Sequence, residues 1–180
     1  FIFNLYIMKY LGQDGVAALT IVFYAEFLLV AIHLGYSSGV APLISYNYGS
    51  KEHDKLKKIY KISMVFIGII SVILFILSIV LAKPITQVFT PKYSVVYNIA
   101  VEGFYLYSLC YLLKGFNIFA SSLFTAFSNG KVSAFLSLMR TLVFIVLCVF
   151  VLTNLFEVTG LWISIPVAEV LAIILSVIYM

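Results

Sequence analysis

The stretch ISMVFIGIISVILFILSIVLA, residues 62–82, is apolar apart from three serines and carries no charged side chain. A helix needs about 20 such residues to cross the hydrocarbon core of a bilayer, whereas a strand of a membrane barrel needs about 10 residues of alternating polarity. A continuous apolar run of this length therefore predicts a membrane-spanning α-helix.

The rest of the chain has the same character. Hydrophobic residues make up 64% of the sequence and charged residues 10%, and the mean hydropathy is +1.16. Soluble domains carry about 25% charged residues. Because lipid offers the backbone no hydrogen bonds, only helices and closed barrels span it. We therefore expect an all-α, polytopic transmembrane helix bundle.

Turn signals divide the chain into about five full spans and the tail of a sixth, within one transmembrane domain. Pro84 and Pro91 are expected to end helices, Pro42 to kink the helix that contains it, and Gly130 to close a helix in the left-handed conformation. The domain covers residues 1–180, and the expected spans are 1–11 (partial), 16–48, 62–82, 95–127, 132–156 and 161–180.

Lysines in the turns predict the orientation. Segments 49–61 and 128–131 together carry six lysines, whereas segments 9–15, 83–96 and 155–159 carry three. Cytoplasmic loops are enriched in Lys and Arg, so we expect the first set and the C-terminal end in the cytoplasm, in a multi-pass protein of the plasma (inner) membrane. Topology thus accounts for the net charge of +4, and no nucleic-acid partner is expected.

Six ionisable side chains lie inside the expected spans, where a central charge costs about 2.5 to 3.5 kcal/mol. Such groups usually face a protein interior or a water-filled cavity and mark a transport path. Their number favours transport over a membrane receptor or scaffold. They are Glu26, His33, Glu102, Lys114, Arg140 and Glu169.

The same spans lack the groups that a membrane hydrolase requires. They hold no Asp and a single His, so a metal cluster, a Ser–His pair or two opposed aspartates cannot be assembled. We expect no enzyme activity, no metal and no cofactor. Cys110 and Cys148 are expected to be small buried side chains.

Three segments resemble parts of the MATE (multidrug and toxic compound extrusion) transporters, in the family's order. They are GYSSGVAPLISYNYGSKEHDKLKKIYK (35–61), FNIFASSLFTAFSNGKVSAFLSLMRTLVF (116–144) and GLWISIPVAEVLAIILSVI (160–178). The resemblance implies twelve helices in two six-helix lobes that exchange H⁺ or Na⁺ for organic cations. Because the sequence begins at Phe1 without an initiator methionine, we expect a fragment, the C-terminal lobe, with the N-terminal lobe absent.

Glu26 and His33 lie seven residues apart, so they share one helix face, about 10 Å apart along the axis. Glu26 is a candidate to bind a proton or cation in a cavity, or else it forms a structural hydrogen bond to an adjacent helix. His33 is suited to titrate near neutrality and relay protons, or else it is a buried histidine bonded to a backbone carbonyl.

A polar stripe runs along the expected helix 95–127 at three- and four-residue spacing. We expect it to line the bundle interior, where tyrosine rings and hydroxyls suit flat organic cations. The alternative is helix–helix packing through hydrogen bonds, above all at the last two positions. The stripe consists of Tyr107, Tyr111, Lys114, Asn117, Ser121 and Thr125.

Lys114 departs from the family that the chain resembles, whose sodium-coupled members tend to have an acidic residue at or near this position. Its ammonium group can take the place of the coupling cation, pair with an acid on a neighbouring helix, or release its proton when buried. Each alternative argues against a sodium site here. Glu102, about 18 Å away along the axis, is expected at the rim of the bundle.

Arg140 and Glu169 are expected to be structural charges that pair with each other and stabilise the packing of the helices. With Glu26 and Glu102, the charges inside the lobe are of mixed sign, which favours cationic or zwitterionic cargo. The hypothesis from sequence is thus an antiporter that exports organic cations by alternating access. Its partners would be membrane lipid, the small-molecule cation and the missing lobe. The alternatives are a flippase for lipid-linked oligosaccharides and a non-transporting receptor or scaffold.

Overall fold

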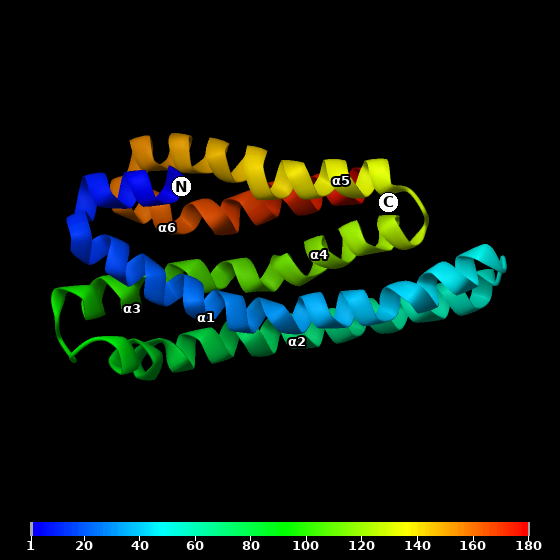
Figure 1. Cartoon of the computed structure of the whole chain (residues 1–180), viewed down its shortest axis with the longest axis horizontal. Coiled ribbons are helices and arrows are strands. Elements are labelled where there is room, and N and C mark those ends of the chain that lie inside the picture. Colours follow the sequence, from blue (N-terminus) through cyan, green and yellow to red (C-terminus); the bar gives the residue numbers. More distant parts are fainter. Residues whose placement is uncertain (1, 180) are drawn as a thin grey trace.

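In the computed structural model, which describes residues 2–179, long helices run back and forth and lie side by side (Figure 1). The all-α class is confirmed, and the described residues contain no strand. The elements in chain order are α1 (Ile2–Gly49), α2 (His53–Phe89), α3 (Val95–Tyr107), the 3₁₀ segment η1 (Ser108–Cys110), α4 (Tyr111–Ala126), α5 (Gly130–Leu138), the π-helical segment η2 (Met139–Phe144) and α6 (Ile145–Tyr179).

Four continuous helical stretches are long and apolar enough to cross a membrane: Ile2–Gly49, His53–Phe89, Val95–Ala126 and Gly130–Tyr179. The first and last are each broken at one residue, and the chain turns back at both breaks (Figure 1). The breaks are Gly12, at φ 61° and ψ −150°, and Glu157, at φ 50° and ψ −125°. The first is a conformation essentially restricted to glycine.

Two expected helix ends are wrong. α2 continues through Pro84 to Phe89, because a membrane helix tolerates an interior proline when nearby groups satisfy the freed carbonyl. Gly130 does not close a helix but begins α5. The left-handed residue in this turn is Ser128, at φ 59°, and the Asn129 side chain caps α5 by accepting from the backbone N–H of Val132.

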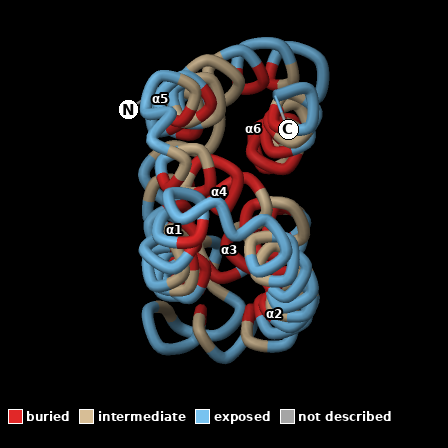
Figure 2. Tube along the Cα trace, turned by 90° about the vertical axis from the view of Figure 1, so that its right-hand side faces the viewer, coloured by how far each residue is buried: buried red, intermediate tan, exposed pale blue. Residues whose placement is uncertain are grey.

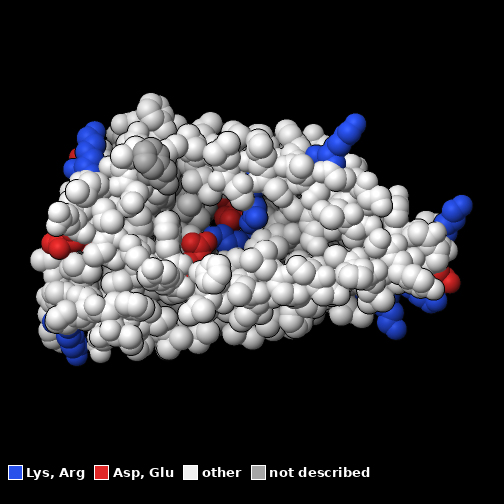
Figure 3. All heavy atoms as spheres, in the orientation of Figure 1, with Lys and Arg blue, Asp and Glu red and all other residues white. Residues whose placement is uncertain are grey.

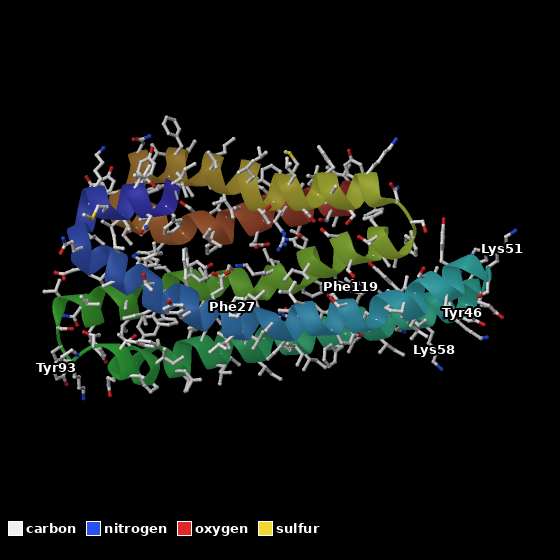
Figure 4. All side chains as sticks on the ribbon, viewed as in Figure 1. Phe27, Tyr46, Lys51, Lys58, Tyr93 and Phe119 are labelled. Atoms are coloured by element: carbon white, nitrogen blue, oxygen red, sulfur yellow. The ribbon has the colours of Figure 1, made fainter. Side chains whose placement is uncertain are left out.

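The basic segment expected as a loop at 49–61 is mostly helical. The turn spans only residues 50–52, and α2 begins at His53. At about 1.5 Å per residue, its 37 residues extend about 55 Å, well beyond the roughly 30 Å of a hydrocarbon core. The lysine-rich first turns therefore project past the bilayer. Lys51 and Lys58 lie at this end, and Tyr93 lies at the opposite end (Figure 4).

The rod formed by α3, η1 and α4 is the centre of the bundle. In its most apolar window, 61% of residues are buried, against 33, 22 and 17% for the other three stretches. Figure 2 shows this concentration of buried residues around α3 and α4. One main cluster packs Phe104 and Tyr107 against Trp162 of α6, and a second packs Phe119 against Ile44 and Ile67 of α1 and α2. Charged groups on this central rod must therefore find partners inside the protein.

Candidate functional site

Four charged side chains from four elements meet in the middle of the bundle. They are Glu26 of α1, Lys114 of α4, Arg140 of η2 and Glu169 of α6. In the space-filling view, acidic and basic side chains are visible together in a recess halfway along the molecule, far from the charges at the two ends (Figure 3). We refer to these four residues as the central cluster.

Lys114 connects the two acids of the central cluster. Its Nζ donates to Oε1 of Glu26 and lies 3.9 Å from Oε1 of Glu169. It also lies 3.5 Å from the hydroxyl of Tyr107 and 5.4 Å from the centre of that ring. The Lys114 side chain is 8% exposed and that of Glu26 is 21% exposed. Of the Lys114–Glu26 pair, only the glutamate is open to an approaching solute.

Glu169 is held from several sides. The Asn117 amide donates to its Oε2 at 2.7 Å and to its backbone carbonyl at 3.0 Å. Nη1 of Arg140 lies 3.7 Å from its Oε1, and its side chain is 5% exposed. Ser176 donates to Asn117 Oδ1 at 3.4 Å and so links the amide to the last turns of α6. A carboxylate with this many partners is fixed in position.

Two irregular helical segments flank the central cluster. The 3₁₀ turn η1 immediately precedes α4, and the π-helical segment η2 contains Arg140. A π-helix shifts the register of the following side chains, and such segments are frequent at functional sites. Sequence reasoning placed Arg140 near Glu169 but had no signal for η2, because helix propensity does not distinguish a π turn from an α turn.

His33 of α1 contacts α4 next to Lys114, and its side chain is buried. The ring packs on the backbone of Gly115, where an added Cβ would lie 2.6 Å from Nδ1 and 2.8 Å from Nε2. Neither ring nitrogen has a hydrogen-bond partner among residues 2–179. The expected bond from His33 to a backbone carbonyl is therefore not formed. A small residue next to Lys114 explains how the ring comes so close.

The polar stripe on α3 and α4 lies inside the bundle over most of its length. The Tyr107 and Tyr111 rings meet edge to face, with centroids 6.3 Å apart, and both are buried. Thr125 is exposed and falls outside this interior face. Its hydroxyl bonds Ser133 of α5 at 2.7 Å, and the Ser133 hydroxyl bonds the carbonyl of Ser121 at 2.8 Å. These two positions of the stripe join α4 to α5.

Glu102 lies away from the central cluster. It is exposed and lines a cavity of about 480 Å³ at the end of the bundle where α2 meets α3, together with Lys83 and Lys92. Within residues 2–179, no three His, Cys, Asp or Glu side chains are arranged to hold a metal ion.

The central cluster has two acids and two bases, so its formal charge is zero. Each ion would be costly alone in a low-dielectric interior, and each has an opposite charge within 4 Å. The arrangement has no nucleophile–base pair. What it can do is bind, release and exchange cations and protons at its exposed edge, Glu26.

Comparisons of the sequence with known proteins agree with one another. The family model described as MatE matches residues 1–150. The multidrug export protein MepA of Staphylococcus haemolyticus is 29% identical over 174 residues, and that of Staphylococcus aureus (strain bovine RF122 / ET3-1) is 26% identical over 168 residues. These alignments cover 96 and 93% of this chain but only 37 and 36% of the relatives. The chain thus spans little more than a third of their length.

Solved structures share the fold. An outward-facing MATE family transporter aligns with a TM-score of 0.90 at 20% identity, covering 99% of this chain and 40% of that one. An inward-facing MATE family transporter aligns with a TM-score of 0.91 at 20% identity, covering 99 and 42%. A transporter of the MOP superfamily from Pyrococcus furiosus gives 0.90 at 21% identity. With a family model matched over most of its length, the chain belongs to the MatE family.

Proposed function

We propose that the chain is one lobe of a secondary active antiporter that exports organic cations in exchange for H⁺ or Na⁺ by alternating access. The second lobe would be supplied by the N-terminal part of the same protein. The single observation on which the proposal rests is the central cluster, which lies inside the lobe and opens on one face at Glu26. Ionisable groups at membrane depth mark substrate and ion paths.

Glu26 is the proposed binding group for the exported cation and for the coupling ion, which compete for the same negative charge. Such competition produces exchange, because each ligand can leave only when the other replaces it. The adjoining Tyr107 ring already lies 5.4 Å from one ammonium group, that of Lys114, and aromatic faces attract cations. This supports a lipophilic cation as cargo. A flippase for pyrophosphate-linked sugars would call for a strongly positive cavity, whereas the central cluster is neutral.

Rocking of two rigid lobes is the proposed motion. The lobe aligns equally well with an outward-facing and an inward-facing transporter, at TM-scores of 0.90 and 0.91. A lobe fold that fits both states supports movement of whole lobes around a fixed site, as in other transporters built from structural repeats.

The proposed orientation places the α1–α2 turn, the α4–α5 turn and the C-terminal end in the cytoplasm, with the protein in the plasma membrane. Six lysines support it by their position at that end of the bundle, whereas three lie at the other. The six are Lys51, Lys55, Lys57, Lys58, Lys61 and Lys131, and the three are Lys9, Lys83 and Lys92.

Everted membrane vesicles that contain the full-length protein provide the test, with ethidium fluorescence as the readout of transport. Glu26→Gln should abolish ethidium accumulation driven by an imposed H⁺ or Na⁺ gradient. Glu102→Gln is the matched control, because it removes an exposed carboxylate of the same helix bundle away from the central cluster. Gradient-driven transport that survives Glu26→Gln unchanged would reject Glu26 as the binding group.

A further inference from the structure

The Lys114 ammonium group lies between two carboxylates that belong to different helices. It is bonded to Glu26 of α1, and Oε1 of Glu169 of α6 lies 3.9 Å from Nζ. A lysine side chain is flexible and its ammonium has three donors. A short rotation of the terminal bonds therefore suffices to move Nζ from one carboxylate to the other.

The two carboxylates are not equivalent. Glu169 has Arg140 at 3.7 Å and the Asn117 amide at 2.7 Å, so it keeps partners when Lys114 turns away. Glu26 has one ion-pair partner in the described chain, Lys114, and it is the more exposed acid, at 21% against 5%. The pair Lys114–Glu26 is thus the one that an incoming proton or cation can break.

We propose that Lys114 is a tethered counter-ion with two positions, which pairs with Glu26 when that carboxylate is empty and moves to Glu169 when a proton or a cationic group neutralises Glu26. The proposal deepens the proposed function, because it names how the same site is vacated and refilled. Loading changes the formal charge of the central cluster from zero to +1, whichever cation is bound.

The second position removes the main energetic obstacle to loading. Breaking a buried ion pair by removing one partner is strongly destabilising, because the remaining charge stays unpaired. Here the released ammonium finds Glu169, which lies within ion-pair distance before any movement of the backbone. Neutralising Glu26 therefore leaves no unpaired charge in the interior, and binding at Glu26 is reversible.

A second consequence concerns the coupling ion. With Lys114 in place, neither carboxylate of the central cluster lacks a cation, so this lobe offers no free site for Na⁺. Without the ammonium, Glu26 and Glu169 would face a common space with one remaining base, Arg140, and an external cation would be attracted there. The wild-type cluster is accordingly expected to respond to protons and organic cations and not to Na⁺.

Other ionisable groups surround Lys114 and will share in any titration of the central cluster. His33 faces α4 from α1, and Cys110 and Tyr111 adjoin Lys114 from η1 and the start of α4. Tyr107 approaches from α3. α2 adds no charge at this depth, because its charged residues lie at positions 53–61 and 83. A test based on pH alone would mix these groups, so the test uses Na⁺.

The experiment measures thermal unfolding of the purified full-length protein in detergent, in NaCl and in choline chloride at equal ionic strength. Wild type should melt at the same temperature in both salts. Lys114→Ala should show a saturable rise of the melting temperature with NaCl, and the double variant Lys114→Ala/Glu26→Gln should lose that rise. A sodium-dependent rise in wild type that Glu26→Gln abolishes would overturn the proposal, and so would a Lys114→Ala protein that ignores Na⁺.

A second measurement keeps the proposal testable if Lys114→Ala does not fold. Glu26→Gln reproduces the neutralised state and should melt close to wild type, because Lys114 turns to Glu169. Glu169→Gln strips the fixed carboxylate from both Lys114 and Arg140 and should lower the melting temperature far more. Equal losses for the two variants would overturn the two-position model. Neither measurement depends on transport, so absence of antiport with the expected melting order would reject the proposed function alone.

Discussion

The contact between His33 and Gly115 leads to a prediction that tests how closely α1 and α4 pack beside the central cluster. A Cβ at position 115 would lie 2.6 and 2.8 Å from the two ring nitrogens of His33. Favourable carbon contacts lie at about 3.5 to 4.0 Å, so Gly115→Ala forces the imidazole or the helices to move. The ring cannot swing freely because it is buried on all sides.

The expected size follows from two opposing effects. Replacing glycine by alanine inside a helix gains about 1 kcal/mol of intrinsic propensity, whereas overpacking a tight interior costs about 1 to 3 kcal/mol. Gly39 of α1 provides the matched control, because a Cβ there meets no atom within 4 Å. Gly39→Ala should gain the propensity alone. The two alanine variants should therefore differ by about 1 to 3 kcal/mol in free energy of unfolding.

Unfolding by SDS in mixed micelles, followed by far-UV circular dichroism, measures this difference. The same substitution at position 115 is then repeated in a His33→Ala background, where the ring is gone and the cost should largely disappear. Equal stability of Gly115→Ala and Gly39→Ala, or an undiminished loss without the imidazole, would refute the packing argument.

Three further predictions use the same unfolding assay. Gly103→Ala should destabilise by about 1 to 3 kcal/mol, since the new Cβ would lie 2.7 Å from Cζ2 of Trp162; an unchanged midpoint would contradict this contact. Asn117→Leu should cost about 1.5 to 3 kcal/mol, because the Glu169 carboxylate loses a charged hydrogen bond; a neutral effect would mean that the bond is dispensable. Glu157→Gly should stabilise by about 1 kcal/mol, because φ 50° suits glycine better than glutamate; a loss of stability would argue for a specific role of its side chain.

The fold class could be predicted from sequence because one property, the length of continuous apolar runs, largely specifies membrane helices. The run at 62–82 lies within α2, and the turn expected near residue 12 coincides with the break at Gly12. The errors at Pro84 and Gly130 arise from local rules derived in water. In a bilayer the chain has no other hydrogen-bond partners, so a helix continues past a proline where a soluble one would end.

The site was predictable in part. The cost of charge in lipid identifies Glu26, Lys114, Arg140 and Glu169 individually, and helical spacing assigns Tyr107 and Asn117 to the face of Lys114. Which acid pairs with Lys114 depends on how three helices dock, and one sequence contains no record of that. The link from Glu169 through Asn117 to the next turns of α6 could not be found for the same reason.

The central cluster also couples the site to the stability of the lobe. On insertion scales, four unpaired charges would cost about 10 to 14 kcal/mol, as much as the whole stability of many proteins. Each of the four comes from a different element, so no helix can bury its own charge until its partner has docked. The cluster therefore selects the correct packing of α1, α4, η2 and α6. Because Glu26 is the only member on the exposed edge and has a single ion-pair partner in the described chain, it is the one position where charge can change during a transport cycle while that packing stays intact.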